Sequence, residues 1–551
     1  MKSTKLFTVL AAGLALAACD GGDINIEPTT SVNNSNNTVN NGGGGTPSDM
    51  CASYVKNGQT IQGTADNNGN CTYGSAFVGP KNNLTVDLLI PALPDGGAHI
   101  FTSSLFVGET YRTQADLQAA GITEGGDGPT LTIEAGATLA FQTNKDFIII
   151  NRGSRILADG RADAPITFTS VSDLNGTVDP ESVQQWGGMV INGFGVSNKC
   201  SYDGIRGQAG FQLTAGTECS IEAEGSAGDD ESQYGGDNDA DDSGILRYVV
   251  VKHTGAEVGN GDELNGISFG GVGSSTVIEN LQVYSTYDDG IEMFGGSVNF
   301  TNVVALYVRD DSIDIDEGYN GTITNALVIQ PENDGNQCIE ADGIGSYSAA
   351  NVALNADFIA RGLNSRPTIN NLTCVFSANE GGTHGSGAGW RFREGIWPVI
   401  NDSLLISSFG ANDESNATDN FCLRIDDTET NDAATNGDLQ LNSVIFACQE
   451  NQADDEQGRA EAMGAQFATI ATGTAVDPST ANNPELQLLE GDQKIYSVSW
   501  ATSMVDSAAP AATTEPTQGN ILGAIEATND WTAGWTYGIH PDNRGQALWI
   551  E

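Results

Sequence analysis

Short apolar segments, separated by glycine and small polar turns, recur along most of the chain. From about residue 130 they read LTIEAGATLAF, DFIIINRGSRILADG and APITFTSV, with only a few apolar residues in each run. Runs this short, with turn residues between them, predict strands rather than helices. In the preceding segment, residues 110–122 (TYRTQADLQAAGI) predict one short helix.

An apolar–x–Asn–apolar motif recurs with a nearly constant period. It centres on four asparagines that follow one another at steps of 22, 23 and 46 residues: Asn280, Asn302, Asn325 and Asn371. A step of about 22–23 residues matches one coil of a parallel β-helix, whose coils stack at roughly 4.8 Å. Asparagine at one turn of each coil predicts a ladder, in which each side-chain amide bonds the backbone of the next coil.

A second motif keeps the same register and reads GISFGG, GIEMFGG, SIDIDEG and CIEADG. Because side chains alternate along a strand, its isoleucines are expected to stack inside the coil. These are Ile267, Ile291, Ile313 and Ile339. The residues that follow them are expected to stack outside: Ser268, Glu292, Asp314 and Glu340. Gly271, Gly296 and Gly318 are expected at the next bend, where a positive φ favours glycine.

Several stretches together resemble a family of bacterial secreted lipoproteins that are predicted to be right-handed parallel β-helices. The stretches are PITFTS (165–170), WGGMVINGFG (186–195), YGGDNDADDSGILRYV (234–249), NGISFGGVG (265–273), DDGIEMFGG (288–296) and DWTAGWTYG (530–538). The resemblance covers residues 130–538. It implies the fold far more than the function, because most members have no known activity. Similar proteins accompany outer-membrane transporters, so it also implies such a partner.

The pattern and the resemblance predict an all-β protein, a right-handed parallel β-helix with a small N-terminal cap and loop insertions. The expected parts are a signal peptide (1–19), a disordered Asn/Gly-rich tether (20–50), an N-terminal cap region (51–128), the β-helix (129–480) and C-terminal coils with a cap (481–551). In the last part, Trp531 and Trp535 are expected to cap the open end of the core rather than to face a sugar.

The N-terminus predicts export. MKSTKLFTVLAAGLALAAC has a basic start and an apolar run that is too short to cross a bilayer. LAAC (16–19) resembles a bacterial lipobox, which implies cleavage before Cys19, lipidation of its thiol and anchoring to a membrane; the alternative is a plain signal peptide. Asp20 resembles an inner-membrane retention signal of some bacteria. We favour the outer membrane or cell surface as the location of the anchor. The periplasmic face of the inner membrane stays open because of Asp20.

The net charge limits the classes of partner that the protein is expected to bind. A formal net charge of −50 and a pI near 4.1 argue against nucleic acid and fit divalent cations. Eight cysteines besides Cys19 form an even number, which in an exported chain predicts disulfides. Sequential pairing is the simplest arrangement, and other connectivities stay open: Cys51–Cys71, Cys200–Cys219, Cys338–Cys374 and Cys422–Cys448.

Calcium is the predicted ligand of the acidic motifs. DNDADDSG (237–244) places carboxylates at alternate positions, and two further acidic pairs recur at equivalent coil positions. The candidate ligands are Asp237, Asp239, Asp241, Asp288, Asp289, Asp310, Asp311, Asp314 and Asp316. Stacked carboxylates repel one another, so either Ca²⁺ lies between the coils or the pairs bond backbone amides at the turn.

The favoured function is non-enzymatic: a surface scaffold or a protein that captures a ligand, such as a glycan, or delivers it to an outer-membrane transporter. The alternative is a polysaccharide lyase or glycoside hydrolase, but no catalytic residue is assigned. THGSGAGWRFREG (383–395) contains histidine, serine and arginines, yet we interpret it as a coil corner with Arg391 and Arg393 paired to acidic neighbours.

Overall fold

The computed structural model describes residues 50–226, 232–259, 262–377, 387–407, 421–447, 466–467, 487–488, 497–499, 521–525 and 529–549. The chain divides into two units, Met1–Gly45 and Thr46–Glu551, and every described residue belongs to the second unit. The predicted lipid anchor at Cys19 and residues 20–49 of the predicted tether lie outside the described residues. Met50, the last residue of that tether, is the first described residue.

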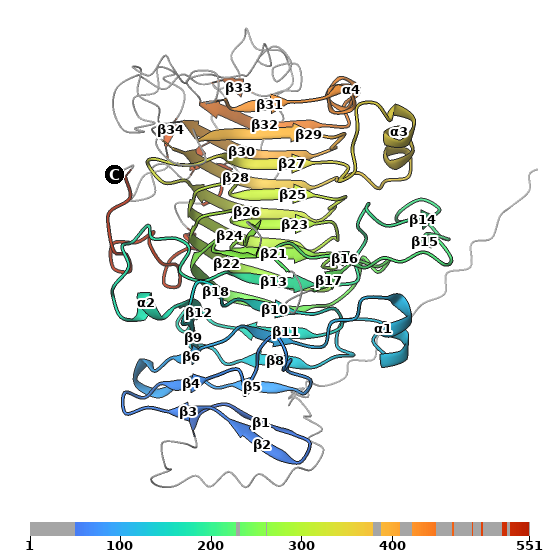
Figure 1. Cartoon of the computed structure of the whole chain (residues 1–551). Helices are drawn as coiled ribbons and strands as arrows, with labels where there is room; N and C mark the ends of the chain where they lie inside the picture. The colour runs from blue at the N-terminus through green and yellow to red at the C-terminus, as the bar shows by residue number, and fades with distance from the viewer. Residues whose placement is uncertain are drawn as a thin grey trace, which may run out of the picture. The chain divides into compact units, whose positions relative to one another are not determined.

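Two long sheets, built almost wholly of parallel strands, form the body of this unit (Figure 1). The first has nine strands: β7 (Leu105–Val107), β10 (Ile148–Ile150), β13 (Met189–Asn192), β21 (Ile267–Gly270), β23 (Ile291–Phe294), β25 (Ile313–Asp316), β27 (Gln337–Asp342), β29 (Ala388–Arg393) and β31 (Leu423–Ile425). They pair in chain order, so each coil adds one strand to the edge of the last. The fold is thus the predicted all-β parallel β-helix.

The second sheet has sixteen strands, and those from β18 to β32 are long because each continues around a bend. The strands are β3 (Thr64–Ala65), β4 (Cys71–Tyr73), β5 (Leu88–Ile90), β6 (His99–Phe101), β8 (Thr130–Ile133), β9 (Thr138–Phe141), β11 (Arg155–Asp159), β12 (Ile166–Ser170), β18 (Gly244–Thr254), β22 (Val277–Thr286), β24 (Asn299–Val308), β26 (Thr322–Ile329), β28 (Thr368–Phe376), β30 (Val399–Ser407), β32 (Gln440–Ala447) and β33 (Gln466–Phe467). Parallel pairing already starts between β4 and β6, so coils begin within the segment expected to form the cap.

Smaller elements decorate the coils. Antiparallel hairpins are β1 (Ser53–Lys56) with β2 (Gln59–Gln62), β14 (Tyr202–Asp203) with β15 (Gln212–Leu213), β16 (Ile221–Glu222) with β17 (Gln233–Tyr234), and β19 (Glu257–Gly259) with β20 (Asp262–Glu263). A three-stranded sheet contains β34 (Gln487–Leu488), β35 (Ser497–Ser499) and β36 (Ile521–Gly523). The helices are α1 (Gln114–Ala120), α2 (Val171–Leu174), α3 (Val352–Ala360) and α4 (Thr428–Asn436). None of the described helices has the length and apolar character needed to cross a membrane.

Isoleucine stacking fills the interior. Ile267 pairs in register with Ile291, and that column continues through Ile313 and Ile339. All four side chains are at most 2% exposed. Burying one such side chain contributes about 1.5–3 kcal/mol, so the repeated column is a major stabilising element of the coils.

The four periodic asparagines lie at the bend within the long strands. Their φ angles are 56° to 61°, in the left-handed region that asparagine tolerates better than most residues. Asn302 donates its amide to the side-chain oxygen of Asn280 at 3.0 Å, Asn325 to Asn302 at 2.9 Å, and Asn371 to Asn325 at 2.9 Å. The ladder therefore joins side chain to side chain, whereas the sequence pattern predicted bonds to backbone.

The C-terminal aromatic segment covers the outside of the second sheet. Tyr537 exchanges two hydrogen bonds with the side chain of Gln282, both at 2.7 Å, and Trp535 packs edge-on against Tyr248. The prediction that these tryptophans cap the open end of the core is wrong. The long strands carry an apolar outer face beyond the bend, including Leu306 and Ile329, and the segment buries that face.

Candidate functional site

One outward-facing row of the nine-stranded sheet changes its chemistry along the coils. Strand register stacks the row in the order Phe106, Ile149, Val190, Ser268, Glu292, Asp314, Glu340, Arg391 and Arg424. The first three members pack in an apolar cluster with Ala223 and Tyr234. These two residues belong to the loop insertion between β13 and β18, which we call the insertion. The next members are polar, then acidic, then basic. We use the name acidic row for Glu292, Asp314 and Glu340 together with the acidic pairs at the turns before β23 and β25. These pairs are Asp288 with Asp289 and Asp310 with Asp311.

The acidic pairs at the preceding turn bond to the next coil. A side-chain oxygen of Asp289 accepts a hydrogen bond from the backbone N–H of Asp311 at 2.9 Å, and Asp311 accepts one from the N–H of Gln337 at 2.6 Å. Asp310 accepts one from the side-chain amide of Asn336 at 2.6 Å. Of the two alternatives drawn from the sequence, the structure therefore contains the bonds to backbone amides.

Carboxylates of the acidic row also come close to one another. Two groups of three each place one oxygen per residue within 4.8 Å of the others: Asp288, Asp289 and Asp310, and Asp289, Glu292 and Asp314. Their donors are all carboxylate oxygens, which suit a hard cation such as Ca²⁺. Asn265 is 1% exposed, bonds Glu292 through its amide nitrogen, and has no hydrogen-bond partner for its own side-chain oxygen. The chemistry of this donor set fits calcium.

Burial and crowding disfavour the ionised state of these carboxyl groups. Burial first, and neighbouring carboxylates second, raise the pKa values of Asp289, Glu292, Asp311 and Asp314 well above the ordinary range. The same causes raise the pKa of Asp316 to about 8. A proton or a cation would relieve the repulsion, and a bound cation would lower these pKa values.

The far end of the row is neutralised by arginines. Arg391 pairs with Glu340 at 3.0 Å and with Asp426 at 2.9 Å. Arg393 pairs with Glu340 at 2.9 Å and also with Asp342. The expected pairing of Arg391 and Arg393 with acidic neighbours is therefore present. The interpretation of their motif as a coil corner is wrong, because Ala388–Arg393 form strand β29. His384 of the same motif lies outside the described residues. Two arginines held between several carboxylates are poorly placed to act as a general base.

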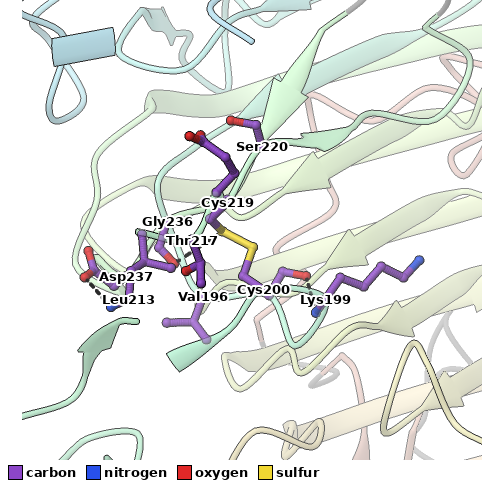
Figure 2. Close-up of a disulfide and its surroundings, with 12 residues drawn as sticks. Val196, Lys199, Cys200, Leu213, Thr217, Cys219, Ser220, Gly236 and Asp237 are labelled. Carbon is purple, nitrogen blue, oxygen red and sulfur yellow. Dashed lines mark hydrogen bonds between the residues drawn. A yellow bond between two sulfur atoms is a disulfide. The ribbon is translucent and has the colours of Figure 1, made fainter. Parts of the chain in front are cut away.

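The aspartates of DNDADDSG do not converge on one point. Asp237 accepts the backbone N–H of Leu213 at 3.0 Å, as Figure 2 shows, and Asp239 forms two bonds of 2.7 Å with Arg206. Asp241 is 2% exposed and accepts backbone N–H groups of Phe194 and Gly125. Asp239 also accepts the backbone N–H of Val196 at 3.2 Å. The three carboxylates thus bond different groups of the protein, and none of them belongs to the groups of close carboxylates found among the described residues.

A disulfide-bonded insertion follows β13 and crosses several coils. Cys200 and Cys219 are joined within it, at the centre of Figure 2. Gly235 has φ 101°, and a Cβ there would lie 2.9 Å from the sulfur of Cys219, so glycine is required at this close approach. Arg206 of the insertion also donates to the carbonyls of Gly296 and Gly318, which belong to successive coils.

The other cysteines pair sequentially wherever both partners are described. Cys51 bonds Cys71, and Cys338 bonds Cys374. The partner expected for Cys422, Cys448, lies outside the described residues, as does Cys19.

Sequence reasoning missed the residues that other segments bring to the acidic row. Asn265 contacts both Glu292 and Glu224, and Glu224 belongs to the insertion. Asp426 reaches Arg391 from the coil that follows. No spacing rule indicates these contacts, because their separations of 27, 41 and 35 residues do not follow the 22–23-residue step of the asparagines.

These features define a disulfide-bonded parallel β-helix protein with a partly neutralised acidic row on one sheet. The chain belongs to the family described as pectate-lyase-like β-helix domains, whose model matches residues 106–536. No curated protein and no solved structure matches the chain.

Proposed function

We propose that this chain is a lipid-anchored, exported β-helix protein that captures a ligand at the outer membrane or cell surface, with calcium in its acidic row. The crowding of Asp289, Glu292 and Asp314 carries the calcium proposal, since their oxygens approach within 4.8 Å; the first two are buried and Asp314 is half-buried. Asp288 and Asp310 would complete the oxygen donors. Calcium supplies positive charge there and offsets the repulsion between stacked coils.

The cysteines support export. Three disulfides among the described residues suit an oxidising compartment outside the cytoplasm. Export agrees with the signal-like N-terminus and with lipidation at Cys19. The related lipoproteins imply delivery to an outer-membrane transporter as one use of such a capture protein.

The arginine pairs favour binding over catalysis. A lyase of this fold class needs a basic group free to take a proton from the substrate. Arg391 and Arg393 instead hold Glu340, Asp342 and Asp426 in ion pairs. The alternative, a polysaccharide lyase or glycoside hydrolase, is favoured by the pectate-lyase-like family alone.

Thermal melting with Ca²⁺ and with EGTA tests the calcium proposal. We expect Ca²⁺ to raise the melting temperature of the wild type and to have little effect on the double variant Glu292→Gln with Asp314→Asn. Asp163→Asn is the matched control, because it removes an exposed carboxylate that pairs with Arg161 on the surface, away from the acidic row. Equal melting temperatures of the wild type in Ca²⁺ and EGTA would refute the proposal.

A glycan array and a turnover assay separate capture from catalysis. Binding without release of reducing ends or unsaturated sugars supports a capture protein. Turnover that persists in the wild type and is lost in Arg391→Gln or Arg393→Gln would establish the enzyme instead.

A further inference from the structure

The first halves of the later long strands present an uncharged outer surface. Ten outward-facing side chains of β24, β26, β28, β30 and β32 form two adjacent columns that we call the neutral face. They are Asn299, Thr301, Thr322, Thr324, Thr368, Asn370, Val399, Asn401, Gln440 and Asn442. All are exposed or half-buried. None of these ten side chains carries a charge, although the chain has 72 acidic residues.

Hydrogen bonds hold the polar groups of the neutral face in place. Asn442 donates its amide to the side-chain oxygen of Asn401 at 2.9 Å, and Asn401 donates to Asn370 at 2.8 Å. Asn370 continues the ladder to the hydroxyl of Thr324 at 3.5 Å. These bonds fix the side chains before any partner arrives, so a ligand does not have to order them. Each amide keeps a second N–H and a second lone pair for that ligand.

The borders of the neutral face are chemically distinct. Below it the same column continues into Glu279, Arg247 and Asp159, which form ion pairs at 2.7 Å and 2.5 Å. At the corner just before β30, Trp397 is partly exposed and stacks with the guanidinium of Arg366 at 4.1 Å. Five coils at roughly 4.8 Å give the face a length of about 19 Å along the stack.

We propose that the neutral face binds an uncharged, hydroxyl-rich polysaccharide chain that lies along the stacked coils. A protein with a net charge of −50 repels anionic polymers, and cationic ones would be drawn to its carboxylates. A neutral glycan is neither repelled by the net charge nor attracted to the carboxylates, so charge does not oppose its binding to the neutral face. Its hydroxyls match the repeated amides and threonine hydroxyls, and the indole of Trp397 offers an apolar ring at the edge. The inference rests on the proposed capture role but not on the calcium of the acidic row.

Pull-down and affinity electrophoresis of the full chain test this site. The probes are cellulose, xylan, mannan and dextran as neutral polysaccharides, and polygalacturonate as an acidic one. We expect at least one neutral probe to bind, equally well in Ca²⁺ and in EGTA, and polygalacturonate not to bind at this face. The double variant Thr301→Glu with Thr324→Glu should weaken binding by about tenfold or more, which corresponds to 1.4 kcal/mol.

Controls and contrary outcomes are distinct from those of the calcium proposal. The double variant Thr60→Glu with Gln62→Glu places the same two charges on exposed positions of β2, in the hairpin β1–β2, and should bind like the wild type. Unchanged melting temperatures verify that the variants fold. No binding to any neutral probe, or binding that the double variant retains, overturns the inference. So does a dimer in solution that the double variant dissociates, because the face would then contact a second copy. If a neutral polysaccharide binds but Ca²⁺ does not change the melting temperature, only the calcium proposal is refuted.

Discussion

The carboxylate of Asp289 accepts the backbone N–H of Asp311 at 2.9 Å, so an acidic residue of one coil bonds the acidic turn of the next. Asp289 is also the residue shared by both groups of close carboxylates. One side chain therefore stabilises the stacking through a hydrogen bond and opposes it through charge repulsion. The balance between the two effects depends on pH and on cations.

Stability without divalent cations should fall as the pH rises from about 4 to about 8. The raised pKa values mean that the folded chain keeps protons, on groups such as Asp316 with a pKa of about 8, that the unfolded chain has already released. Stability falls with pH wherever the folded state binds more protons. We expect a loss of at least about 2 kcal/mol over this range. Denaturant unfolding in EGTA at several pH values measures it, and Ca²⁺ should flatten the curve. A stability that rises across the range would contradict the crowding argument.

Asp289→Asn should have opposite effects on two measurements. The amide keeps an oxygen that can accept the N–H of Asp311 but removes the charge. In EGTA at pH 8 we expect a higher melting temperature than in the wild type, since repulsion is relieved. In Ca²⁺ the variant should gain less from the cation, because a ligand is missing. Asp163→Asn is again the control, and a variant that shifts equally in both buffers would show that Asp289 has no part in cation binding.

Asn302→Ala should destabilise the coils by about 3–4 kcal/mol. Alanine at φ 61° costs about 1–2 kcal/mol, and two ladder hydrogen bonds of about 1 kcal/mol each are lost. Asn302→Gly accepts the positive φ and should cost less than alanine. Guanidinium unfolding of both variants separates backbone strain from hydrogen bonding. If alanine and glycine cost the same, the left-handed bend is not what selects asparagine.

Removal of the Cys338–Cys374 disulfide should lower stability by about 2–4 kcal/mol. This bond joins β27 to β28 inside the coil and closes a 36-residue separation. We expect the Cys338→Ser, Cys374→Ser variant to melt earlier as a whole. The Cys200→Ser, Cys219→Ser variant is the comparison, and it should loosen the insertion more than the coils. Hydrogen exchange distinguishes the two, because protection should fall in the nine-stranded sheet only for the first variant.

Gln282→Ala should release the C-terminal segment locally. The side-chain oxygen of Gln282 accepts the N–H of Tyr537 at 2.7 Å, and Gln282 is fully buried. Hydrogen exchange at Tyr537 should therefore accelerate in the variant. The N–H of Gly343, which bonds the carbonyl of Arg393 at 3.1 Å within the coils, serves as an internal reference. Unchanged exchange at Tyr537 would mean that apolar packing alone holds the segment.

The sequence by itself determined the repeating architecture. A coil of the β-helix contacts only its neighbours, so the period of Asn280 and Asn302 and the alternation of Ile291 and Glu292 carry the register directly. Inside and outside follow from that alternation. For the same reason the sequence could indicate that Asp289 and Asp311 stack, although it left open whether they bond a cation or an amide.

Only the tertiary structure decided which outward residues are covered and by what. Glu292 faces outward, yet it is 6% exposed because Asn265 and the insertion that carries Glu224 lie over it. Trp535 packs on the side of the second sheet rather than at the end of the core. Asp237, Asp239 and Asp241 alternate as calcium ligands would, but each forms hydrogen bonds with other groups of the protein. Contacts of this kind have no period, because they depend on where loops of different lengths fold back onto the coils. The repeating sequence pattern does not specify the paths of these loops.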